Sequence, residues 1–383
     1  MIYQRLKTME VKYSVLWILL MLITACNNKE TRYDPNTKVI TLERNVGDQK
    51  AGKDLYSKIE FIPLKEDDDY LIGEVTKAIS NDSIFYILDA NKSQALYSYS
   101  YTGTPTGKFY HFGGGRNEYA EIIDFTVDSV NQEISIFCLP PKLIITDLNF
   151  NIKKDAVILG SEYADRMEKL NDTYYFYNHY TRRVTGYDIE QNKFTNLLEV
   201  KNMKGSIFTS RPTFYPVSGK LYFQAPGDDC IYVLEGSRFI PYLIFDYENK
   251  ASSRKFYSNA RPDNISFEER RINLLPYVSC VFEKAGNISF FYTFDFGVRS
   301  CLQTPNGYSD QSRMFFVGGG AVAYKNNCLF TCAFTNEEPL FNPAPEYAEY
   351  VDLYKAFMEG VSISYPPKDE NFENPIMVIY HLN

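Results

Sequence analysis

The 383-residue sequence predicts an all-β protein, a six-bladed β-propeller formed by residues 37–383. The main observation is repetition, because a short β segment entered through a polar turn recurs six times. The successive gaps are 50, 40, 47, 67 and 41 residues when they are measured between Ile84, Ile134, Tyr174, Leu221, Ile288 and Leu329. A four-stranded propeller blade takes roughly 40–50 residues. Aromatic residues, at 16% of the chain, also fit densely packed β-sheet.

Residues 1–25 are predicted to be a lipoprotein signal peptide. A basic flank precedes the apolar run from Val15 to Ile23, and Ile23-Thr-Ala-Cys26 follows it. The run is too short for a bilayer span, which needs about 20 residues, and suits a cleaved export signal. We therefore expect lipid attachment at Cys26, with residues 26–36 as a lipidated linker. The protein would be anchored in a bacterial cell envelope, at the outer membrane, facing either the periplasm or the outside.

The charge balance argues against nucleic acid as a partner. A cut before Cys26 leaves 37 basic and 47 acidic residues, a net charge of −10. Phosphate binding needs a basic surface, so no nucleic-acid partner is expected. The lipid, and not a polybasic patch, would hold the protein at a membrane.

Strands and helices can be assigned from local patterns. In four repeats a second strand follows, at residues 95–99, 142–146, 183–187 and 230–234. Alternating strands at 57–64 and 375–382 are expected to share the last blade and close the ring, because an open propeller leaves an exposed edge. A helix starting at Ser266 is predicted within an insertion at 251–276, between blades four and five, and a second helix spans Glu346 to Glu359 near the C-terminus.

Several of these segments resemble one family. They are Ile59-Glu-Phe-Ile-Pro-Leu64, Phe85-Tyr-Ile-Leu-Asp89, Phe112-Gly-Gly-Gly-Arg-Asn-Glu-Tyr119 with Asp124-Phe-Thr-Val-Asp128, and the ending Asn374-Pro-Ile-Met-Val-Ile-Tyr380. Over residues 40–383 the chain resembles the six-bladed β-propeller lipoproteins of Bacteroides-type bacteria, which are similar to NHL-repeat propellers. The resemblance implies the propeller fold and implies no particular activity.

The glycine turn at 113–115 is predicted to be structural. A dinucleotide loop needs a third spaced glycine that opens a helix, whereas Glu118 occupies that place and a strand follows. The turn would carry the chain from one blade to the next, which places Glu118 and Tyr119 near the mouth of the central channel.

A ligand-binding surface is predicted at this channel mouth. Turns between blades share a face with turns between the second and third strands of each blade, and the residues expected there are Arg116, Glu118, Tyr119, His179, Arg182, Arg211, Asp228, Asp229 and Arg299. Arg and Tyr are typical of binding surfaces because they supply forked donors and rigid contact area. The alternative is that these residues are polar side chains scattered over loops.

Catalytic, metal and cofactor signatures are not found in the sequence. The three histidines lie in different repeats; His111 and His381 are interpreted as packed, hydrogen-bonded strand residues and His179 as a solvated loop residue. Asp67–Asp69 and Asp228–Asp229 lack the spacing of a calcium loop, so no metal is predicted. The pair Cys328 and Cys332 lies about 13 Å apart along a strand and is interpreted as packed small side chains. No cofactor is expected.

Two functions remain open at the level of sequence. The first is a non-enzymatic binding or scaffold propeller that presents the channel mouth to a glycan, a peptide or an envelope protein. The second is a carbohydrate-active hydrolase or lyase, with acids and arginines from several blades converging on the same mouth.

Overall fold

The fold was examined in a computed structural model that describes residues 37–42, 52–159, 163–200, 213–247, 276–284, 286–294, 297–304, 307–314, 323–333, 355–364 and 374–383. Nearly all regular structure in these residues is strand. The expected signal peptide and linker, up to residue 36, and most of the expected insertion at 251–276 lie outside the described residues. Among the helices that are described, none has the length and apolar character needed to cross a membrane.

Three sheets follow one another along the first half of the chain, each a meander of four antiparallel strands. Sheet 1 contains β3 (Lys77–Ser80), β4 (Ile84–Asp89), β5 (Ala95–Ser100) and β6 (Pro105–Phe109). Sheet 2 contains β7 (Glu121–Asp128), β8 (Glu133–Leu139), β9 (Lys142–Asp147) and β10 (Ile152–Ile158). Sheet 3 contains β11 (Arg166–Leu170), β12 (Thr173–Asn178), β13 (Arg183–Asp188) and β14 (Lys193–Glu199).

Three more sheets are formed by the second half together with two N-terminal strands. Sheet 4 contains β15 (Phe214–Val217), β16 (Lys220–Phe223), β17 (Cys230–Glu235) and β18 (Arg238–Tyr247), with β1 (Lys38–Leu42) added parallel to β18. Sheet 5 contains β19 (Tyr277–Lys284), β20 (Asn287–Phe294), β21 (Gly297–Thr304) and β22 (Gly307–Met314). Sheet 6 contains, in spatial order, β23 (Ala323–Lys325), β24 (Cys328–Ala333), β26 (Ile376–Leu382), β2 (Tyr56–Pro63) and β25 (Ile363–Ser364).

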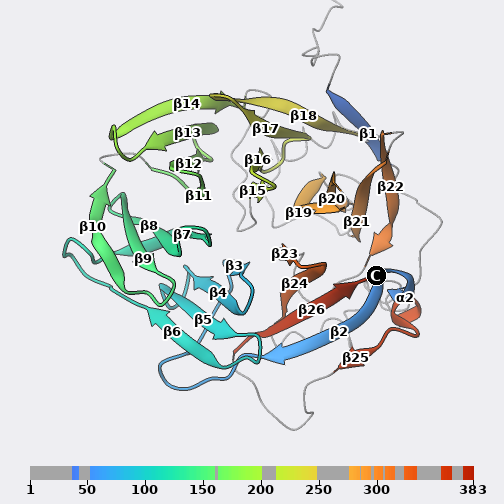
Figure 1. The fold of residues 1–383 in the computed structure, drawn as a ribbon, viewed down its shortest axis with the longest axis horizontal. Helices are drawn as coiled ribbons and strands as arrows, with labels where there is room; N and C mark the ends of the chain where they lie inside the picture. The colour runs from blue at the N-terminus through green and yellow to red at the C-terminus, as the bar shows by residue number, and fades with distance from the viewer. Residues whose placement is uncertain are drawn as a thin grey trace, which may run out of the picture. The chain divides into compact units, whose positions relative to one another are not determined.

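The sheets are arranged around a ring, as in a β-propeller (Figure 1). The first strand of each sheet lies innermost, and β3, β7, β11, β15, β19 and β23 contact one another in that order, with β23 returning to β3. Apolar side chains fill the spaces between neighbouring sheets, for example Phe125 and Ile136 between sheets 1 and 2. Each of the six repeated sequence segments is the second strand of a different sheet, so the predicted repeat is the structural unit.

Ring closure by the two ends of the chain is confirmed. Strand β26 lies between β24 and β2, and it pairs antiparallel with both, so that Phe61 lies opposite Val378. The helix expected to start at Ser266 lies outside the described residues. Of the helix expected at Glu346–Glu359, only the last residues are described, and Lys355–Met358 are helical. A four-residue helix, α2 (Gly52–Leu55), precedes β2 and was not predicted.

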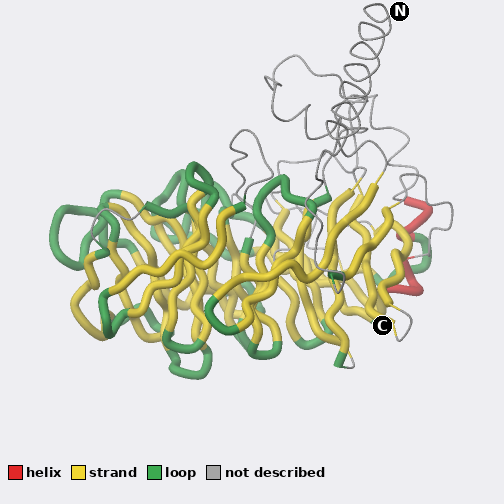
Figure 2. Tube along the Cα trace, turned by 90° about the horizontal axis from the view of Figure 1, so that it is seen from above, coloured by secondary structure: helices red, strands yellow, loops and turns green. Residues whose placement is uncertain are grey.

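The strands run between two faces of loops (Figure 2). We call the crossover face the one that carries the connections between sheets and the turns between second and third strands, and the hairpin face the opposite one. Contacts agree with this assignment: on the crossover face, the backbone N–H of His179, in the β12–β13 turn, donates to Oδ2 of Asp165, in the β10–β11 connection, at 2.7 Å.

Candidate binding site in the central cavity

A cavity of about 180 Å³ lies where the innermost strands of all six sheets meet. Its lining residues are Lys77, Ala78, Ile79 and Ser80 from β3, Thr126 and Val127 from β7, Glu168 from β11, Phe214, Tyr215 and Pro216 from β15, Ser279, Cys280 and Val281 from β19, and Tyr324 from β23. The lining combines aromatic rings, hydroxyl groups and two ionisable side chains. A concave site with a few converging polar groups is the usual place for a small ligand.

Lys77 is fixed at one side of this cavity. Its Nζ lies 2.9 Å from Oδ1 of Asp124 and donates to the carbonyl oxygens of Phe125, at 2.7 Å, and Met167, at 3.4 Å. Asp124 is only 2% exposed, and its Oδ2 accepts the backbone N–H of Met167 at 2.7 Å. The lysine charge is therefore balanced by a carboxylate, and three sheets are connected through these contacts.

Glu168 is the second ionisable group of the lining. It is buried, its Oε1 accepts a hydrogen bond from the Thr126 hydroxyl, and the same oxygen accepts the backbone N–H of Lys169 at 3.0 Å. Burial raises the pKa of Glu168 above its ordinary value, although the charge of Lys77 acts in the opposite direction. A raised pKa widens the pH range in which a carboxyl group is protonated, and only in its protonated form can the group donate as well as accept hydrogen bonds.

The rest of the lining is neutral. Tyr215 donates its hydroxyl proton to the carbonyl oxygen of Val278 at 2.6 Å, which fixes its ring, and Ser80 donates to the carbonyl oxygen of Asn81. Burial raises the pKa of the Cys280 thiol, so this cysteine is a poor nucleophile at neutral pH. The cavity is thus equipped for hydrogen bonding and ring contacts with an uncharged ligand.

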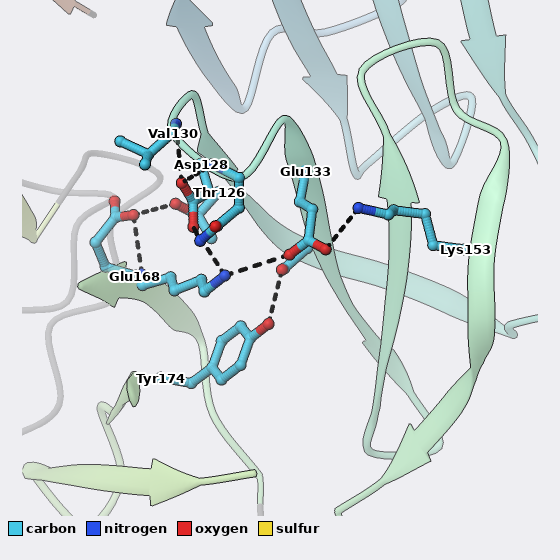
Figure 3. A network of polar contacts seen from close by, with 10 residues as sticks. Thr126, Asp128, Val130, Glu133, Lys153, Glu168 and Tyr174 are labelled. Carbon is cyan, nitrogen blue, oxygen red and sulfur yellow. Dashed lines mark hydrogen bonds and ion pairs between the residues drawn. The ribbon is translucent and has the colours of Figure 1, made fainter. Parts of the chain in front are cut away.

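A network of charges lies next to Glu168, between sheets 2 and 3 (Figure 3). Nζ of Lys169 lies 2.8 Å from Oδ2 of Asp128 and 3.4 Å from Oε2 of Glu133, and Lys153 pairs with the other oxygen of Glu133 at 2.8 Å. Burial acts to raise the pKa of Asp128, but hydrogen bonds from Lys169 and Asn131 outweigh it and lower the pKa to about 2. This network stabilises the position of β11 and with it Glu168.

The glycine turn lies away from the cavity, contrary to the sequence prediction. Arg116 is exposed, and its Nη1 pairs with Oδ2 of Asp155 on β10, the outermost strand of sheet 2, at 3.1 Å. Glu118 Oε2 accepts the backbone N–H of Gly115 at 2.7 Å. A Cβ on Gly113 would lie 2.2 Å from that carboxylate, so the glycine makes room for it.

Tyr119 is buried, and its predicted position at the channel mouth is wrong. Its hydroxyl donates to the carbonyl oxygen of Gln94 at 2.6 Å, and its ring packs in the core between sheets 1 and 2. Burial raises its pKa. The large apolar ring gains more from this core than from the surface. The expectation that strand follows the turn is correct, because β7 begins at Glu121.

Of the predicted site residues, Arg182 and Asp228 lie close enough to the buried Tyr177 for their charges to act on it, and His179 lies beside Asp165. Burial and the charges of Asp165 and Asp228 raise the pKa of Tyr177, and the charge of Arg182 lowers it. His179 is 6% exposed, with Nδ1 2.6 Å from Oδ2 of Asp165. The prediction of a solvated loop histidine is therefore wrong, because a carboxylate partner allows the imidazole to be buried.

The two aspartates of the fourth repeat are buried and serve the fold. Asp228 is 2% exposed and accepts the Tyr232 hydroxyl at 2.9 Å, while its carbonyl oxygen accepts the Gln224 amide at 2.7 Å. The carbonyl oxygen of Asp229, itself 1% exposed, accepts the backbone N–H of Phe245 at 2.9 Å. These contacts hold the β16–β17 turn, so Asp228 and Asp229 do not form an exposed binding surface.

Arg211 and Arg299 are the last two predicted site residues. Arg211 lies outside the described residues. Arg299 is in strand β21, opposite Tyr292 and Arg313, and not in a loop. His111 was interpreted as a packed strand residue, but it lies outside the strands, is exposed and stacks on Phe109. Within the part of the chain that the structure describes, no cluster of three or more His, Cys, Asp or Glu side chains is arranged to hold a metal ion.

The cavity residues were missed by sequence reasoning, although a signal existed. Lys77, Thr126 and Glu168 lie on innermost strands, a few residues before the polar turn that opens each aligned segment. A polar or charged residue at that place in several repeats points to the axis of a propeller, because only the first strand of each blade lines the channel. The repeated segments begin at the second strand of each sheet and therefore do not include this position.

The fold and the cavity define the class of protein as a β-propeller with a central cavity lined by both apolar and polar side chains. The chain belongs to the family described as "Domain of unknown function (DUF4934)", which matches residues 37–327. No curated protein matches it.

Two solved structures from Bacteroides are similar to this chain. A "putative exported protein" from Bacteroides fragilis is 16% identical, with a TM-score of 0.60 over 90% of this chain and 100% of that one. A member of the DUF4221 family from Bacteroides vulgatus is 10% identical, with a TM-score of 0.44 over 86% of this chain and 97% of that one. The match to the Bacteroides fragilis protein supports the propeller arrangement.

Proposed function

We propose that this protein is an exported, lipid-anchored propeller that binds the end of a glycan in its central cavity and catalyses no reaction. The observation that carries the proposal is the cavity, to which all six innermost strands contribute residues. In this proposal sheets 1 to 6 are the six blades, residues 1–25 are a signal peptide, and residues 26–36 are a linker lipidated at Cys26.

The chemistry of the lining favours an uncharged ligand rich in hydroxyl groups. The charge of Lys77 is balanced by Asp124, and burial favours the neutral form of Glu168. The hydroxyl groups of Ser80 and Ser279 belong to the same lining, and three aromatic side chains, of Phe214, Tyr215 and Tyr324, supply ring faces. Sugars present hydroxyl groups on their edges and apolar C–H groups on their faces, which complements this set.

The size of the cavity narrows the ligand further. Its volume of about 180 Å³ is below the roughly 300–1,000 Å³ of pockets for drug-sized molecules. One sugar unit at a chain end fits this space better than a long oligosaccharide would. A peptide or an envelope protein would have to present one small neutral side chain to use the same cavity.

Binding can be tested with the mature protein on a panel of glycans, followed by calorimetry. Ser279→Leu fills the cavity from β19 and should weaken binding of the best glycan at least tenfold, or about 1.4 kcal/mol. The matched control is Thr195→Leu, the same kind of change on the exposed outer strand β14, which should bind as wild type does. Unchanged affinity in a folded Ser279→Leu protein would show that the cavity is not the binding site. A panel without any binder would refute the proposal that the ligand is a glycan.

The anchor is supported by the sequence Ile23-Thr-Ala-Cys26 after an apolar run, and by the description of the similar Bacteroides fragilis protein as exported. Wild type should incorporate labelled fatty acid and fractionate with membranes, whereas Cys26→Ala should not be labelled and should become soluble or remain as precursor. Equal membrane partitioning of both proteins, without label in wild type, would refute lipidation.

A further inference from the structure

Three strands of sheet 6 place a cysteine, a histidine and a glutamate in a row. Cys328 on β24 lies directly opposite His381 on β26, and its Sγ is 3.4 Å from Nδ1 of the imidazole. The other ring nitrogen, Nε2, is 2.9 Å from Oε2 of Glu60 on β2. All three side chains are partly exposed, so solvent and small molecules can approach them. The cluster belongs to sheet 6 and is separate from the residues that line the central cavity.

The geometry suits proton transfer and does not suit metal binding. The two ring nitrogens of His381 face different partners, so the thiol and the carboxylate cannot bind one ion together with a single ring nitrogen. A thiol next to an imidazole that is oriented by a carboxylate is the arrangement of a nucleophile, its general base and an orienting group.

Charges around the imidazole determine its tautomer. A hydrogen bond from Lys58 lowers the pKa of Glu60, partly opposed by burial, and His381 lowers it further. An ionised Glu60 only accepts hydrogen bonds, so Nε2 of His381 carries the proton and Nδ1 is left to accept the thiol proton. Lys325 on β23 also lies opposite Cys328, but its ammonium group pairs with the carboxylate of Asp82 at 2.9 Å.

The thiol itself requires such a base. Burial, followed by the charge of Glu60, raises the pKa of Cys328. The thiol is therefore protonated at neutral pH, and reaction needs transfer of its proton to Nδ1 of His381. Three other cysteines of the described residues, Cys138, Cys230 and Cys280, are buried and have no such access.

We propose that Cys328 is a modification site that attacks small-molecule disulfides, with His381 as its base and Glu60 as the positioning residue. The Sγ of Cys328 forms a bond to one sulfur of the disulfide, the S–S bond of the reagent breaks, and the thiol proton passes to His381 Nδ1. The departing thiolate takes that proton back from His381, so the products are a free small-molecule thiol and a mixed disulfide on Cys328. The disulfide is the only oxidant in this exchange, which needs a thiolate, a base and access.

The chain contains a matched control for this reaction. Cys332 lies on the same strand, four residues further on, and is also partly exposed, but it lies opposite Met377 and not opposite a histidine. Modification of the mature protein by an aromatic disulfide, mapped to each cysteine by mass spectrometry, compares the two thiols directly. Cys328 should react at least about tenfold faster than Cys332 at pH 7.

Substitution of the base separates chemistry from packing. In His381→Gln the rate at Cys328 should fall about tenfold while the rate at Cys332 stays the same, and Glu60→Gln should give a smaller decrease. Equal rates at Cys328 with and without His381, or a Cys332 that reacts as fast in wild type, would overturn the proposal. The wild-type comparison of the two cysteines decides even if His381→Gln fails to fold.

Discussion

Two boundaries between neighbouring sheets, here called joints, both contain buried apolar side chains but differ in the charged contacts that cross them. Between sheets 2 and 3, charged groups cross the boundary: Lys169 on β11 reaches Asp128 and Glu133, and Asp124 on β7 accepts the backbone N–H of Met167 (Figure 3). Between sheets 4 and 5 the boundary is mainly apolar. The buried side chains that meet there include Ile231, Val233, Leu243, Val278, Phe290 and Tyr292.

The same ring is therefore stabilised in two ways. The apolar joint depends on buried area and close packing, which do not change with protonation. The charged joint depends on complete pairing, because removal of one partner leaves the other charge buried. We therefore expect the ring to respond to acid and to charge removal at one side, and to loss of side-chain volume at the other.

The largest effect is expected at Lys77, which links sheets 1, 2 and 3. Lys77→Ala leaves the 2%-exposed Asp124 without its cation and should cost about 3–5 kcal/mol of unfolding free energy. Denaturant unfolding of the mature protein measures this. The double variant Lys77→Met with Asp124→Asn removes both charges and should recover part of the loss. A cost below about 1 kcal/mol in Lys77→Ala would show that the charged joint does not depend on pairing.

Acid should weaken the charged joint by a smaller amount. The pKa of Asp128 is lowered to about 2 in the folded protein from an ordinary 3.8, so its stabilising contribution is present above pH 3.8 and is lost as the pH falls towards 2. This is worth roughly 2 kcal/mol. Wild type should lose that much more stability than Asp128→Asn between pH 5 and pH 2. Parallel acid profiles of the two proteins would contradict the assigned role of Asp128.

The apolar joint should show a modest, pH-independent response to loss of volume. Ile231→Val removes one methylene from a fully buried side chain on β17 and should cost about 0.5–1.5 kcal/mol. The same cost is expected at pH 7 and at pH 4, in contrast to the charged joint. A cost that changes between these two pH values would mean that the two joints are coupled.

The smallest effect is expected at the glycine turn. The side chains of Arg116 and Asp155 are 65% and 62% exposed, and such surface pairs contribute little. Arg116→Ala should change the unfolding free energy by less than about 0.5 kcal/mol and should leave glycan binding unchanged. Weakened binding in this variant would indicate that the ligand binds at the crossover face and not in the cavity.

Much of the fold was predictable because repetition and alternation are local signals. The segments that begin near Ile84, Ile134 and Leu329 each mark the second strand of a sheet, and the alternation in Ile376, Val378 and Tyr380 identified the closing strand. In the structure this alternation places one face of β26 on sheet 5 and the other on sheet 1, which specifies the register of the closure.

The site was less predictable, because it depends on partners distant in sequence. Arg116 pairs with Asp155, and Asp124 with Lys77, over separations that no local pattern specifies. Polar residues were expected at the surface, yet His179 and Asp228 are buried, because His179 lies beside the carboxylate of Asp165 and Asp228 accepts a hydrogen bond from the Tyr232 hydroxyl. The row of Cys328, His381 and Glu60 likewise exists only because β24, β26 and β2 are neighbours in the sheet.

Strand β1 has a mechanical consequence in the proposed form of the protein that is anchored by lipid at Cys26. It is bonded to β18 of sheet 4, whereas the next strand along the chain, β2, belongs to sheet 6. A pull on the residues before Lys38 therefore loads the β1–β18 hydrogen bonds before it can reach β2, which pairs with the ring-closing strand β26. In that anchored form we expect β1, an edge strand, to separate from β18 under tension before the pairing of β2 with β26 is disturbed.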